Sequence, residues 1–394
     1  MKILFTLTPS FNPHSGGVQQ TTYKLGKFFT EAGHEVHYFS MADTGNEIAK
    51  YGTLHTASKP GGQNNRDNNK QLMQVISQVQ PDIVINQMPY EENMRETLYQ
   101  AKQKHEFLLL GCLRNSLFSV KNNLDAYAQS IFPSALQPLV LNKAGKRMLL
   151  SLHRKRHRNQ LKNIIDRHDY FILLTPSNEE ELTWFVDDYD KNKVHAIPNS
   201  IPEIKAPKQN YEKVILHVGR LNSGQKRSDL LLPVWKKLYP QLPDWKFVVV
   251  GDGPYKEVME DEIKKENIPR VELAGKQDPG PYYESASLFL MTSAFEGFPN
   301  VLLEAQSYGL VPFVFNSYPA VSWLVNHKQN GYLIPSFNCE AMAQEVLSLV
   351  NNNPEHFFSI SKEAQNNASR FTIEQVGRQW LELFDAHVKH EAIN

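Results

Sequence analysis

The sequence predicts an α/β protein of two doubly wound domains, and two patterns carry this prediction. Short apolar runs alternate with longer segments of helical periodicity along the chain. Because strands that are apolar along their whole length are buried on both faces, these runs are typical of parallel sheets covered by helices. The alternation restarts after a segment at about 198–212 that holds three prolines and no sustained periodicity, which indicates a linker between two domains.

The strand candidates fall into two sets of five apolar runs. The first set is 2–8, 35–40, 82–86, 106–111 and 169–175, and the second is 213–219, 245–251, 271–275, 287–293 and 311–315. Between the first two runs, residues at steps of four and three mark one helical face, namely Val18, Thr22, Leu25, Phe29 and Ala32. Gly33 suits the end of this helix.

The domain boundaries follow from the linker. We expect a first domain at 1–200 and a second at 201–373, facing each other across a deep cleft. The last amphipathic segment, about 374–394, carries one apolar stripe of Val376, Trp380, Phe384 and Val388. This segment either packs on the second domain or crosses back to the first. Doubly wound sheets bind ligands at the carboxyl ends of their strands, so we expect functional residues there.

Composition narrows the class of protein. With 42 Lys and Arg and 42 Asp and Glu, the net charge is +0, which gives a nucleic-acid partner no support. The two cysteines, Cys112 and Cys339, lack the spacing of a zinc-cysteine site and fit a reducing compartment. The start "MKILFTLTPS" is too short for a signal peptide, and no run approaches the roughly 20 apolar residues of a membrane span. We therefore expect a cytoplasmic protein.

Two glycines follow the first predicted strand, in "NPHSGGVQQ". Gly16 and Gly17 have no Cβ, so backbone amides can approach a ligand closely, and the helix beginning near Val18 directs its positive end there. An ordinary tight turn fits the same residues equally well. The dinucleotide pattern G-x-G-x-x-G is absent here and in "GDGPYK" at 251–256, so neither loop predicts a dehydrogenase.

Two cations bracket a glycine loop after the first strand of the second domain, in "HVGRLNSGQKRSDLLL". Arg220 and Lys226 lie on either side of Gly224, beside a predicted strand end. An arginine fork and a lysine ammonium at such a loop suit a diphosphate, because the arginine binds in bidentate fashion and the lysine as a point charge. Most basic pairs are solvated surface, and the position beside a strand end favours binding here.

The stretch "FEGFPNVLLEA", after the strand "SLFLMTS", holds two carboxylates, Glu296 and Glu304. Pro299 suits the first turn of a helix, so Asn300 and Val301 would offer free backbone amides to an anion or a sugar oxygen. Glu296 then lies in the loop and Glu304 inside the helix, and the two face one ligand from different directions. Two unrelated surface acids are the alternative.

Together these segments resemble the retaining glycosyltransferases of family 4, which have the GT-B fold. "TSAFEGFPNVLLEAQSYGLVP" is similar to the E-x7-E segment of that family, and "HVGRLNSGQKRSDLL" to its G-R-L…K-G-x-D segment. "GDGP", "LAGK" and the N-terminal "GG" fall in the expected order. The resemblance covers most of the chain, is most specific over about 214–312, and implies two Rossmann-like domains.

The resemblance implies a nucleotide-sugar donor bound mainly by the second domain and an acceptor bound by the first. Arg220 and Lys226 would hold the diphosphate, with Gly16 and Gly17 closing on it from the first domain. Glu304 would accept hydrogen bonds from the ribose hydroxyls. Glu296 would position the donor hexose and form the catalytic set with Arg220 and Lys226. The other donor-binding candidates are Lys276, Phe298, Pro299, Asn300 and Val301.

The implied chemistry requires no cofactor and no metal. Breaking a sugar–phosphate bond leaves a nucleoside diphosphate with developing negative charge, which pre-placed cations stabilise. In this family, retention is usually explained by front-face attack, so no enzymic nucleophile is implied. "DDYD" at 187–190 has the spacing of an Asp-x-Asp metal site, but a solvated acidic patch is the better interpretation.

One position departs from the family pattern. Many relatives carry a histidine near the donor sugar, where "LLLGCLRNSLF" here places Arg114 or Asn115. Since arginine cannot act as a neutral base, this position would bind acceptor or phosphate instead. His14, in the glycine loop, is a second substitute, although a solvated loop histidine fits as well. These three residues are the acceptor or sugar candidates.

The segment Lys143 to His168 is strongly basic, with nine Lys and Arg residues and one acid, Asp166. Members of the family that glycosylate lipid-linked acceptors often dock on anionic membranes through basic patches of the first domain. The resemblance therefore implies peripheral association with the inner face of the cell membrane. Neutralisation of this face by the acidic stretch Glu179 to Asp190 is the alternative.

The expected activity is retaining transfer of a hexose or N-acetylhexosamine from a nucleotide diphosphate sugar, with a UDP-sugar favoured. The acceptor would be a saccharide or lipid-linked saccharide in surface polysaccharide or glycoconjugate synthesis. Two alternatives stay open: a nucleotide-sugar epimerase of the same fold, and a non-catalytic paralogue that binds nucleotide sugars. The E-x7-E pattern speaks against the epimerase, and the missing histidine is the one feature that suggests the paralogue.

Overall fold

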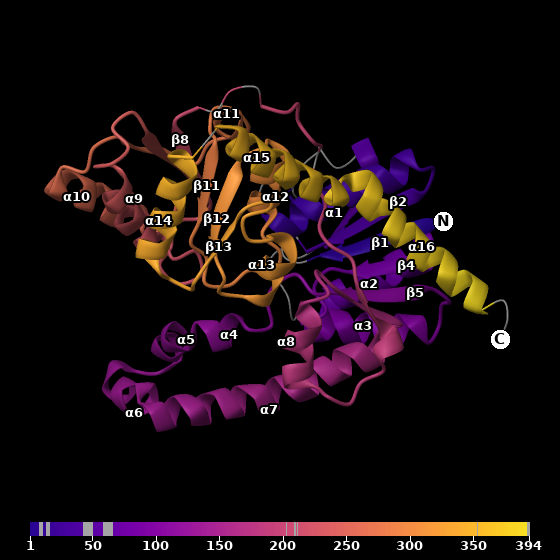
Figure 1. The fold of residues 1–394 in the computed structure, drawn as a ribbon. Coiled ribbons are helices and arrows are strands. Elements are labelled where there is room, and N and C mark those ends of the chain that lie inside the picture. Colours follow the sequence, from indigo (N-terminus) through magenta and orange to yellow (C-terminus); the bar gives the residue numbers. More distant parts are fainter. Residues whose placement is uncertain are drawn as a thin grey trace. The chain divides into compact units, whose positions relative to one another are not determined.

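The computed structural model describes residues 1–394 except 8–10, 13–15, 42–49, 58–65, 202, 209, 211, 353 and 392–394. The chain divides into two compact units, and Figure 1 labels most of their helices and several of their strands. Unit 1 comprises Met1–Asn115, Ser151–Ser200 and Ile373–Asn394, and unit 2 comprises Ser116–Leu150 and Ile201–Thr372.

Unit 1 is built on a seven-stranded sheet in the order β3-β2-β1-β4-β5-β6-β7, parallel at every pairing. Its strands are β1 Lys2–Leu7, β2 Glu35–Ser40, β3 Thr53–Thr56, β4 Ile83–Asn86, β5 Leu108–Cys112, β6 Tyr170–Leu173 and β7 Val194–Ala196. All five strands expected in the first half are present. The two that were not expected, β3 and β7, are short edge strands without a buried apolar run.

Helices accompany this sheet in the expected alternation. They are α1 Gly17–Glu31, α2 Arg66–Val79, α3 Glu92–Lys102, α8 Asn178–Phe185, α16 Ile373–Glu391 and, from residue 151 on, α7 Lys143–Arg167. The expected end of α1 is confirmed, because Gly33 has φ +85° and its amide donates to Thr30 O at 3.0 Å. This is the left-handed conformation that commonly ends a helix.

The final helix, α16, packs on unit 1. Val376, Trp380 and Phe384 are buried in the same core cluster as Phe29 of α1. The apolar stripe ends there, since Val388 is 59% exposed. Of the two positions that the sequence left open for this segment, the structure shows the crossing back to the first unit.

Unit 2 is built on a six-stranded parallel sheet in the order β10-β9-β8-β11-β12-β13. Its strands are β8 Val214–Val218, β9 Lys246–Val250, β10 Val271–Gly275, β11 Leu288–Met291, β12 Val311–Phe315 and β13 Tyr332–Ile334. Its helices after the sheet begins are α9 Leu231–Leu238, α10 Lys256–Glu266, α11 Gly280–Glu284, α12 Asn300–Ser307, α13 Pro319–Leu324, α14 Cys339–Val350 and α15 Pro354–Ala368. The five strands expected in the second half are present, so the prediction of two parallel α/β domains is confirmed.

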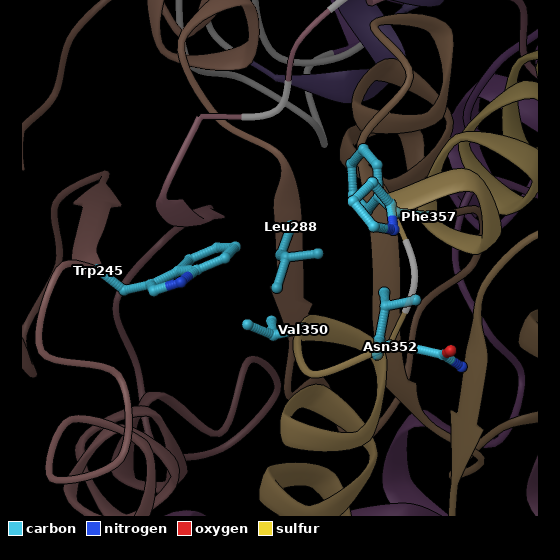
Figure 2. A pocket seen from close by; sticks show the side chains of 7 residues that line it. Trp245, Leu288, Val350, Asn352 and Phe357 are labelled. Atoms are coloured by element: carbon cyan, nitrogen blue, oxygen red, sulfur yellow. The ribbon is translucent and has the colours of Figure 1, made fainter.

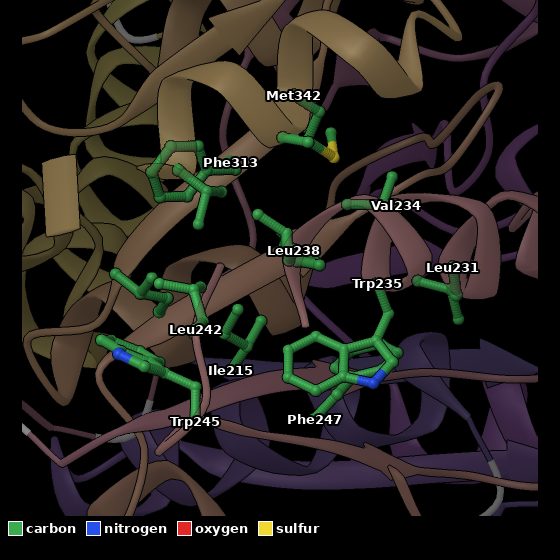
Figure 3. Close-up of a cluster of buried hydrophobic side chains, with 14 of the residues drawn as sticks. Ile215, Leu231, Val234, Trp235, Leu238, Leu242, Trp245, Phe247, Phe313 and Met342 are labelled. Carbon is green, nitrogen blue, oxygen red and sulfur yellow. The ribbon is translucent and has the colours of Figure 1, made fainter. Parts of the chain in front are cut away.

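The core of unit 2 lies between its sheet and helices α9 and α14. Figure 3 shows Trp235 of α9 near Phe247 of β9, and Leu238 of α9 and Met342 of α14 belong to the same buried cluster. Each of these side chains is fully buried, which stabilises the fold by about 1.5–3 kcal/mol per large apolar group. Trp235 Nε1 also donates to Pro269 O at 2.9 Å, so its one polar atom is satisfied. This core holds the strands whose carboxyl ends carry the candidate site.

The division of the chain breaks between Ser200 and Ile201, at the expected boundary, but differs from the expectation over 116–150. This insertion carries α4 Ser119–Asn122, α5 Leu124–Ile131, α6 Gln137–Leu141 and the start of α7, and it groups with unit 2. Asn122 Nδ2 donates to Ser317 O at 3.5 Å, and the Asn123 amide lies against Gly224. The sequence alone could not predict that residues 116–150 group with unit 2, because no segment of linker composition flanks them.

Candidate functional site

The predicted residues of unit 2 follow neighbouring parallel strands at the points where those strands end. Arg220 follows β8, Lys276 follows β10, and Glu296 lies in the loop after β11. Because the sheet is parallel throughout, these three loops share its carboxyl edge. Arg220 and Lys276 are exposed, whereas Glu296 is 6% exposed.

Glycines let the loops after β8, β9 and β10 pack backbone against backbone. Gly219 N donates to Val250 O at 3.0 Å, and Gly251 N donates to Gly275 O at 2.8 Å. Gly251 has φ +152°, and a Cβ added there would lie 1.8 Å from Gly219 O. Gly253, at φ +153°, faces Leu221 O in the same way. The glycines of "GDGP" therefore serve close packing of this edge.

Lys226 and Glu296 form an ion pair inside this edge. Lys226 Nζ lies 2.7 Å from Glu296 Oε1, and the two side chains are 16% and 8% exposed. The second carboxylate oxygen, Oε2, accepts a hydrogen bond from Gln225 Nε2 at 3.1 Å. The sequence assigned the lysine to a diphosphate and the glutamate to a sugar. The structure brings both groups to one place.

Local hydrogen bonds fix the loop that carries Lys226. Asn222 Oδ1 accepts from the amides of Gln225 and Lys226 at 2.9 and 3.0 Å, so this side chain closes the loop on itself. Thr292 Oγ1 donates to Lys226 O at 2.8 Å, and Ala294 N donates to Gln225 O at 2.7 Å. The loops after β8 and β11 are thus joined directly, which positions the ammonium against the carboxylate.

Two buried side chains, Tyr318 and His217, lie near the ion pair of Lys226 and Glu296. Burial raises the pKa of Tyr318, and the nearby Glu296 carboxylate raises it further. Burial lowers the pKa of His217 to about 4, the Leu290 carbonyl opposes that shift, and the Lys226 charge adds to it. His217 is therefore neutral, with Nδ1 within 2.9 Å of Leu290 O. Both groups stay uncharged beside the ion pair at neutral pH.

The second carboxylate lies on helix α12. Glu304 is partly buried, and Tyr283 Oη donates to its Oε2 at 3.3 Å. Burial raises the pKa of Tyr283 well above its ordinary value, and Glu304 adds to this effect, so the hydroxyl keeps its proton. Tyr283 stacks on Tyr308 with ring centroids 5.3 Å apart. The tyrosine therefore orients the carboxylate that the sequence assigned to ribose.

The start of α12 differs from the expected geometry. Pro299 is the N-cap residue rather than part of the first turn, and the Asn300 amide donates to Phe298 O at 3.0 Å. This amide is already used, so the expectation of two free amides was wrong for Asn300. Pro299, at φ −82° and ψ 77°, forms the tight turn that bends the Asn300 N–H back. Val301 lies in the first turn, whose amides have no partner inside a helix.

Phe298 contributes its side chain to packing. It is 8% exposed, and its ring meets Phe371 at a centroid distance of 5.9 Å in an edge-on arrangement. Residues 292–299 are buried throughout. The loop between the two glutamates is therefore a fixed part of the unit, and a ligand would meet a preformed surface.

The predicted residues of unit 1 are less fully described. Gly16 and Gly17 are exposed at the start of α1, with Gly16 as N-cap. His14 lies outside the described residues. Arg114 follows β5, and its Nε and Nη1 donate to Gln87 Oε1 and Asn199 Oδ1 at 2.5 and 3.0 Å. Asn115 is exposed beside it.

The acidic stretch near 187–190 pairs with helix α7. Arg158 Nη2 lies 2.8 Å from Asp187 and 3.0 Å from Asp188, and Lys162 Nζ lies 2.7 Å from Asp188. These ion pairs fit the alternative interpretation, in which the acidic stretch neutralises part of the basic segment. Among the described residues, no three His, Cys, Asp or Glu side chains gather in a group that would hold a metal ion.

A small apolar pocket lies elsewhere in unit 2. Figure 2 shows Trp245, Leu288, Val350 and Phe357 around it. Trp245 immediately precedes β9 and Leu288 begins β11, so the pocket opens at the amino ends of the strands. It is therefore at the opposite edge of the sheet from the candidate site.

Four residues of the site were not predicted from the sequence: Gln225, Tyr283, Thr292 and Tyr318. The sequence could have identified Gln225, because this residue precedes Lys226 in a loop that was predicted to bind a ligand. Tyr283 and Tyr318 had no such signal, since each lies in an ordinary helical or loop segment. The two tyrosines come close to the carboxylates only in the folded sheet, where neighbouring strands pair.

Comparison with solved structures defines the fold. The chain aligns with the crystal structure of Anabaena Alr3699/HepE in complex with UDP at a TM-score of 0.73 and 16% identity, covering 98% of this chain and 100% of that one. At this identity the likeness shows the fold, which is the GT-B glycosyltransferase fold of two parallel-sheet α/β units.

Comparison of sequences gives similarity to a family over part of the chain. Residues 212–352 match the family described as glycosyl transferases group 1. An uncharacterized glycosyltransferase of Haemophilus influenzae is 34% identical over 223 residues, 54% of this chain and 60% of the relative. A poly(ribitol-phosphate) alpha-N-acetylglucosaminyltransferase of Staphylococcus aureus is 28% identical over 218 residues, 55% of this chain and 43% of the relative. The chain thus aligns with about half the length of these curated relatives.

The expected resemblance to glycosyltransferases is confirmed at this level. The retaining outcome and the family 4 assignment stay predictions. Within the described residues, the helices include none that is both long and apolar enough to cross a membrane.

Proposed function

We propose that this protein is a glycosyltransferase that moves a hexose or N-acetylhexosamine from a nucleotide diphosphate sugar to a saccharide or lipid-linked saccharide. The observation that carries the proposal is the preformed pair of Lys226 and Glu296 at the carboxyl edge of unit 2, with Glu304 on the adjoining helix. The group 1 match over 212–352 covers these residues. Retention of anomeric configuration is part of the proposal.

The proposed donor site assigns each group a chemical task. Arg220, exposed at the end of β8, and Lys226 stabilise the charge that develops on the leaving diphosphate. Glu296 accepts hydrogen bonds from the sugar, and Glu304, oriented by Tyr283, accepts them from the ribose. Lys276 and the backbone amide of Val301 complete the donor set. The expectation that Gly16 and Gly17 contact the donor stays part of the proposal.

The choice of donor and acceptor rests on relatives. Anabaena Alr3699/HepE was solved in complex with UDP and in complex with UDP-glucose, and this favours a UDP-sugar. Relatives named for poly(ribitol-phosphate) and for amylovoran biosynthesis favour an acceptor in surface polysaccharide synthesis. The proposed chemistry uses no metal, because side-chain cations stabilise the leaving group.

A nucleotide-release screen tests this proposal. The protein is incubated with UDP-, GDP- and ADP-sugars, with and without candidate acceptors, and the free nucleoside diphosphate is measured. We expect release from one donor class that rises when a suitable acceptor is added. Release of an epimer without acceptor would favour the epimerase, and binding without any turnover would favour a non-catalytic paralogue.

We also propose peripheral docking on an anionic membrane. Large apolar side chains of unit 2 are exposed on and around helices α5, α6 and the start of α7, namely Ile131, Leu136, Leu139 and Met148. Basic residues of α7 accompany them, including Lys143 and Arg147, and such a combination suits an interfacial surface. Vesicle co-sedimentation tests this: binding should require anionic lipid and weaken on Leu139→Ser with Met148→Ser. Sedimentation that is independent of lipid charge would contradict it.

A further inference from the structure

At the carboxyl edge of the unit 1 sheet, one cation is held by neutral groups. Arg114 follows β5, and it donates to the side-chain oxygens of Gln87, which follows β4, and Asn199, which follows β7. Among the described residues, no carboxylate pairs with this guanidinium, and its Nη2 has no hydrogen-bond partner. Burial lowers the pKa of Arg114, and the neighbouring Cys112 opposes this shift. Arginine side chains keep their charge in proteins.

This arrangement is costly unless an anion completes it. Arg114 is partly buried, so its charge loses part of its hydration, and native proteins normally pair such groups. Gln87 and Asn199 fix the direction of the fork but contribute no negative charge. The free nitrogen carries two N–H donors, which suit an oxyanion.

Further unused donors share the same edge of the sheet. Gln87 Nε2, Asn178 Nδ2 and Ser200 Oγ are buried without a partner among the described residues. These side chains follow β4, β6 and β7, so with Arg114 they come from four adjacent strands. Gln87, Asn178 and Ser200 are at most 2% exposed. A phosphate, with several acceptor oxygens, can use more of these donors than a carboxylate can.

We propose that Arg114, with Gln87, Asn178 and Ser200, binds a phosphate group of the acceptor, so that the acceptor is a phosphorylated saccharide, polyol or lipid. The identity of the bound molecule as an acceptor rests on the proposed function. The phosphate site itself rests on the geometry of unit 1 alone.

The binding test uses inorganic phosphate as the probe. Protein is first saturated with whichever of UDP, GDP and ADP stabilises it, and phosphate binding is then measured by calorimetry. We expect phosphate to bind the wild-type protein under these conditions. In Arg114→Gln the dissociation constant should rise about 10- to 100-fold, because a charge-assisted hydrogen bond is lost. Arg114→Lys, which keeps the charge without the fork, should give an intermediate value.

Two further variants, Lys191→Gln and Ser200→Ala, complete the phosphate-binding test. Lys191→Gln removes an exposed cation just before β7, at the opposite edge of the same sheet, and should leave phosphate binding unchanged. Ser200→Ala should weaken binding by about threefold without lowering the unfolding midpoint, since this hydroxyl has no partner among the described residues. If Arg114→Gln does not fold, Arg114→Lys and Ser200→Ala carry the result. Equal phosphate affinity in all variants, or phosphate binding that saturating nucleotide abolishes, would overturn the proposal.

A kinetic comparison distinguishes the acceptor from the donor as the source of the phosphate. With a phosphorylated acceptor and its dephosphorylated form, Arg114→Gln should raise KM for the phosphorylated acceptor and leave KM for the donor unchanged. An equal rise in donor KM with both acceptors would place the guanidinium on the donor and overturn the proposal. If no acceptor supports transfer, the proposed function fails, while the phosphate titration still decides whether the anion site exists.

Discussion

Lys226 and Glu296 are each other's principal partner, and this pairing links stability to ligand binding. Both side chains are largely buried, so removing one leaves the other without its counter-ion. A diphosphate would offer the ammonium a second negative partner. The pair is therefore expected to be strong in the free protein and weaker in the complex.

A double-mutant cycle tests this at the residue scale. Lys226→Met should lower the free energy of unfolding by about 3 kcal/mol, because it leaves a buried carboxylate with only Gln225. Glu296→Gln should cost less, about 1 kcal/mol, since the lysine is more exposed and can reach water. Urea unfolding of both single variants and the double variant should give a coupling of about 1–3 kcal/mol, which falls when the preferred nucleoside diphosphate is added. A coupling near zero in the free protein would contradict the pair.

A second residue-scale prediction concerns Tyr283. Tyr283→Phe removes the hydroxyl that donates to Glu304 and leaves the ring in place. Nucleoside diphosphate affinity, measured by calorimetry, should fall about 3- to 10-fold. Tyr308→Phe is the control, because Tyr308 stacks on Tyr283 and should leave the affinity unchanged. Equal effects of the two substitutions would show that the stack, rather than the hydroxyl, matters.

At the scale of elements, the glycines after β8, β9 and β10 decide how closely the strand ends approach. A Cβ at Gly251 would overlap the Gly219 carbonyl at 1.8 Å, whereas a Cβ at Gly275 would meet no atom closer than Lys256 Nζ at 3.8 Å. Both glycines have positive φ, +152° and +72°. Alanine at either position therefore strains the backbone, and at Gly251 the steric overlap adds to that strain.

The two glycines, Gly251 and Gly275, give a prediction about stability at the scale of elements. Gly275→Ala should lower the free energy of unfolding by about 1–2 kcal/mol, the ordinary cost of a left-handed alanine. Gly251→Ala should cost about 3 kcal/mol or more, because the β8 and β9 loops must also separate. Urea unfolding of the two variants compares them directly. Similar values would mean that the Gly219 loop shifts aside at little cost.

The elements that the sequence predicted are those whose signal is local. Most of the expected strands are buried runs rich in apolar residues in the interior of a parallel sheet, and the five-residue edge strand β10 is the partly buried exception. The strands β3, β7 and β13 were missed because edge strands of three or four residues lack such a run. The insertion at 116–150 was assigned to the wrong unit, because its hydrogen bond to Ser317 joins residues far apart in the chain.

The same distinction applies to the candidate site. Glu296, Lys226 and Glu304 were predicted because they follow strands in recognisable spacing. Their partners Tyr283 and Tyr318 were not, because those contacts depend on helix packing and on the pairing of β11 with β12. The amide of Asn300 was misjudged since a turn at Pro299 redirects it toward Phe298.

At the scale of the whole molecule, buried histidines make stability depend on pH. Burial lowers the pKa of both His168 and His217 to about 4, from an ordinary value of 6.5. The folded state therefore binds fewer protons than the unfolded state between these values. The stabilisation is complete above pH 6.5 and is lost as the pH falls toward 4.

This predicts an acid loss of on the order of 2 kcal/mol per histidine between pH 7 and pH 5. His168→Gln should flatten the dependence, because it removes the imidazole that Asn86 Nδ2 and Ile164 O contact at 3.2 and 2.7 Å. Urea unfolding of wild type and variant at the two pH values checks this. A slope that the substitution leaves unchanged would assign the acid sensitivity to other groups.

The central claim is that unit 2 binds a nucleoside diphosphate through Lys226 and Glu304. Calorimetric titration of the wild-type protein and Glu304→Ala with UDP, GDP and ADP tests it most directly. One nucleotide should bind the wild-type protein, and Glu304→Ala should weaken that binding about tenfold, as expected for lost hydrogen bonds to a carboxylate. If none of the three binds the wild-type protein, or if Glu304→Ala binds as tightly, the assignment of this site is contradicted.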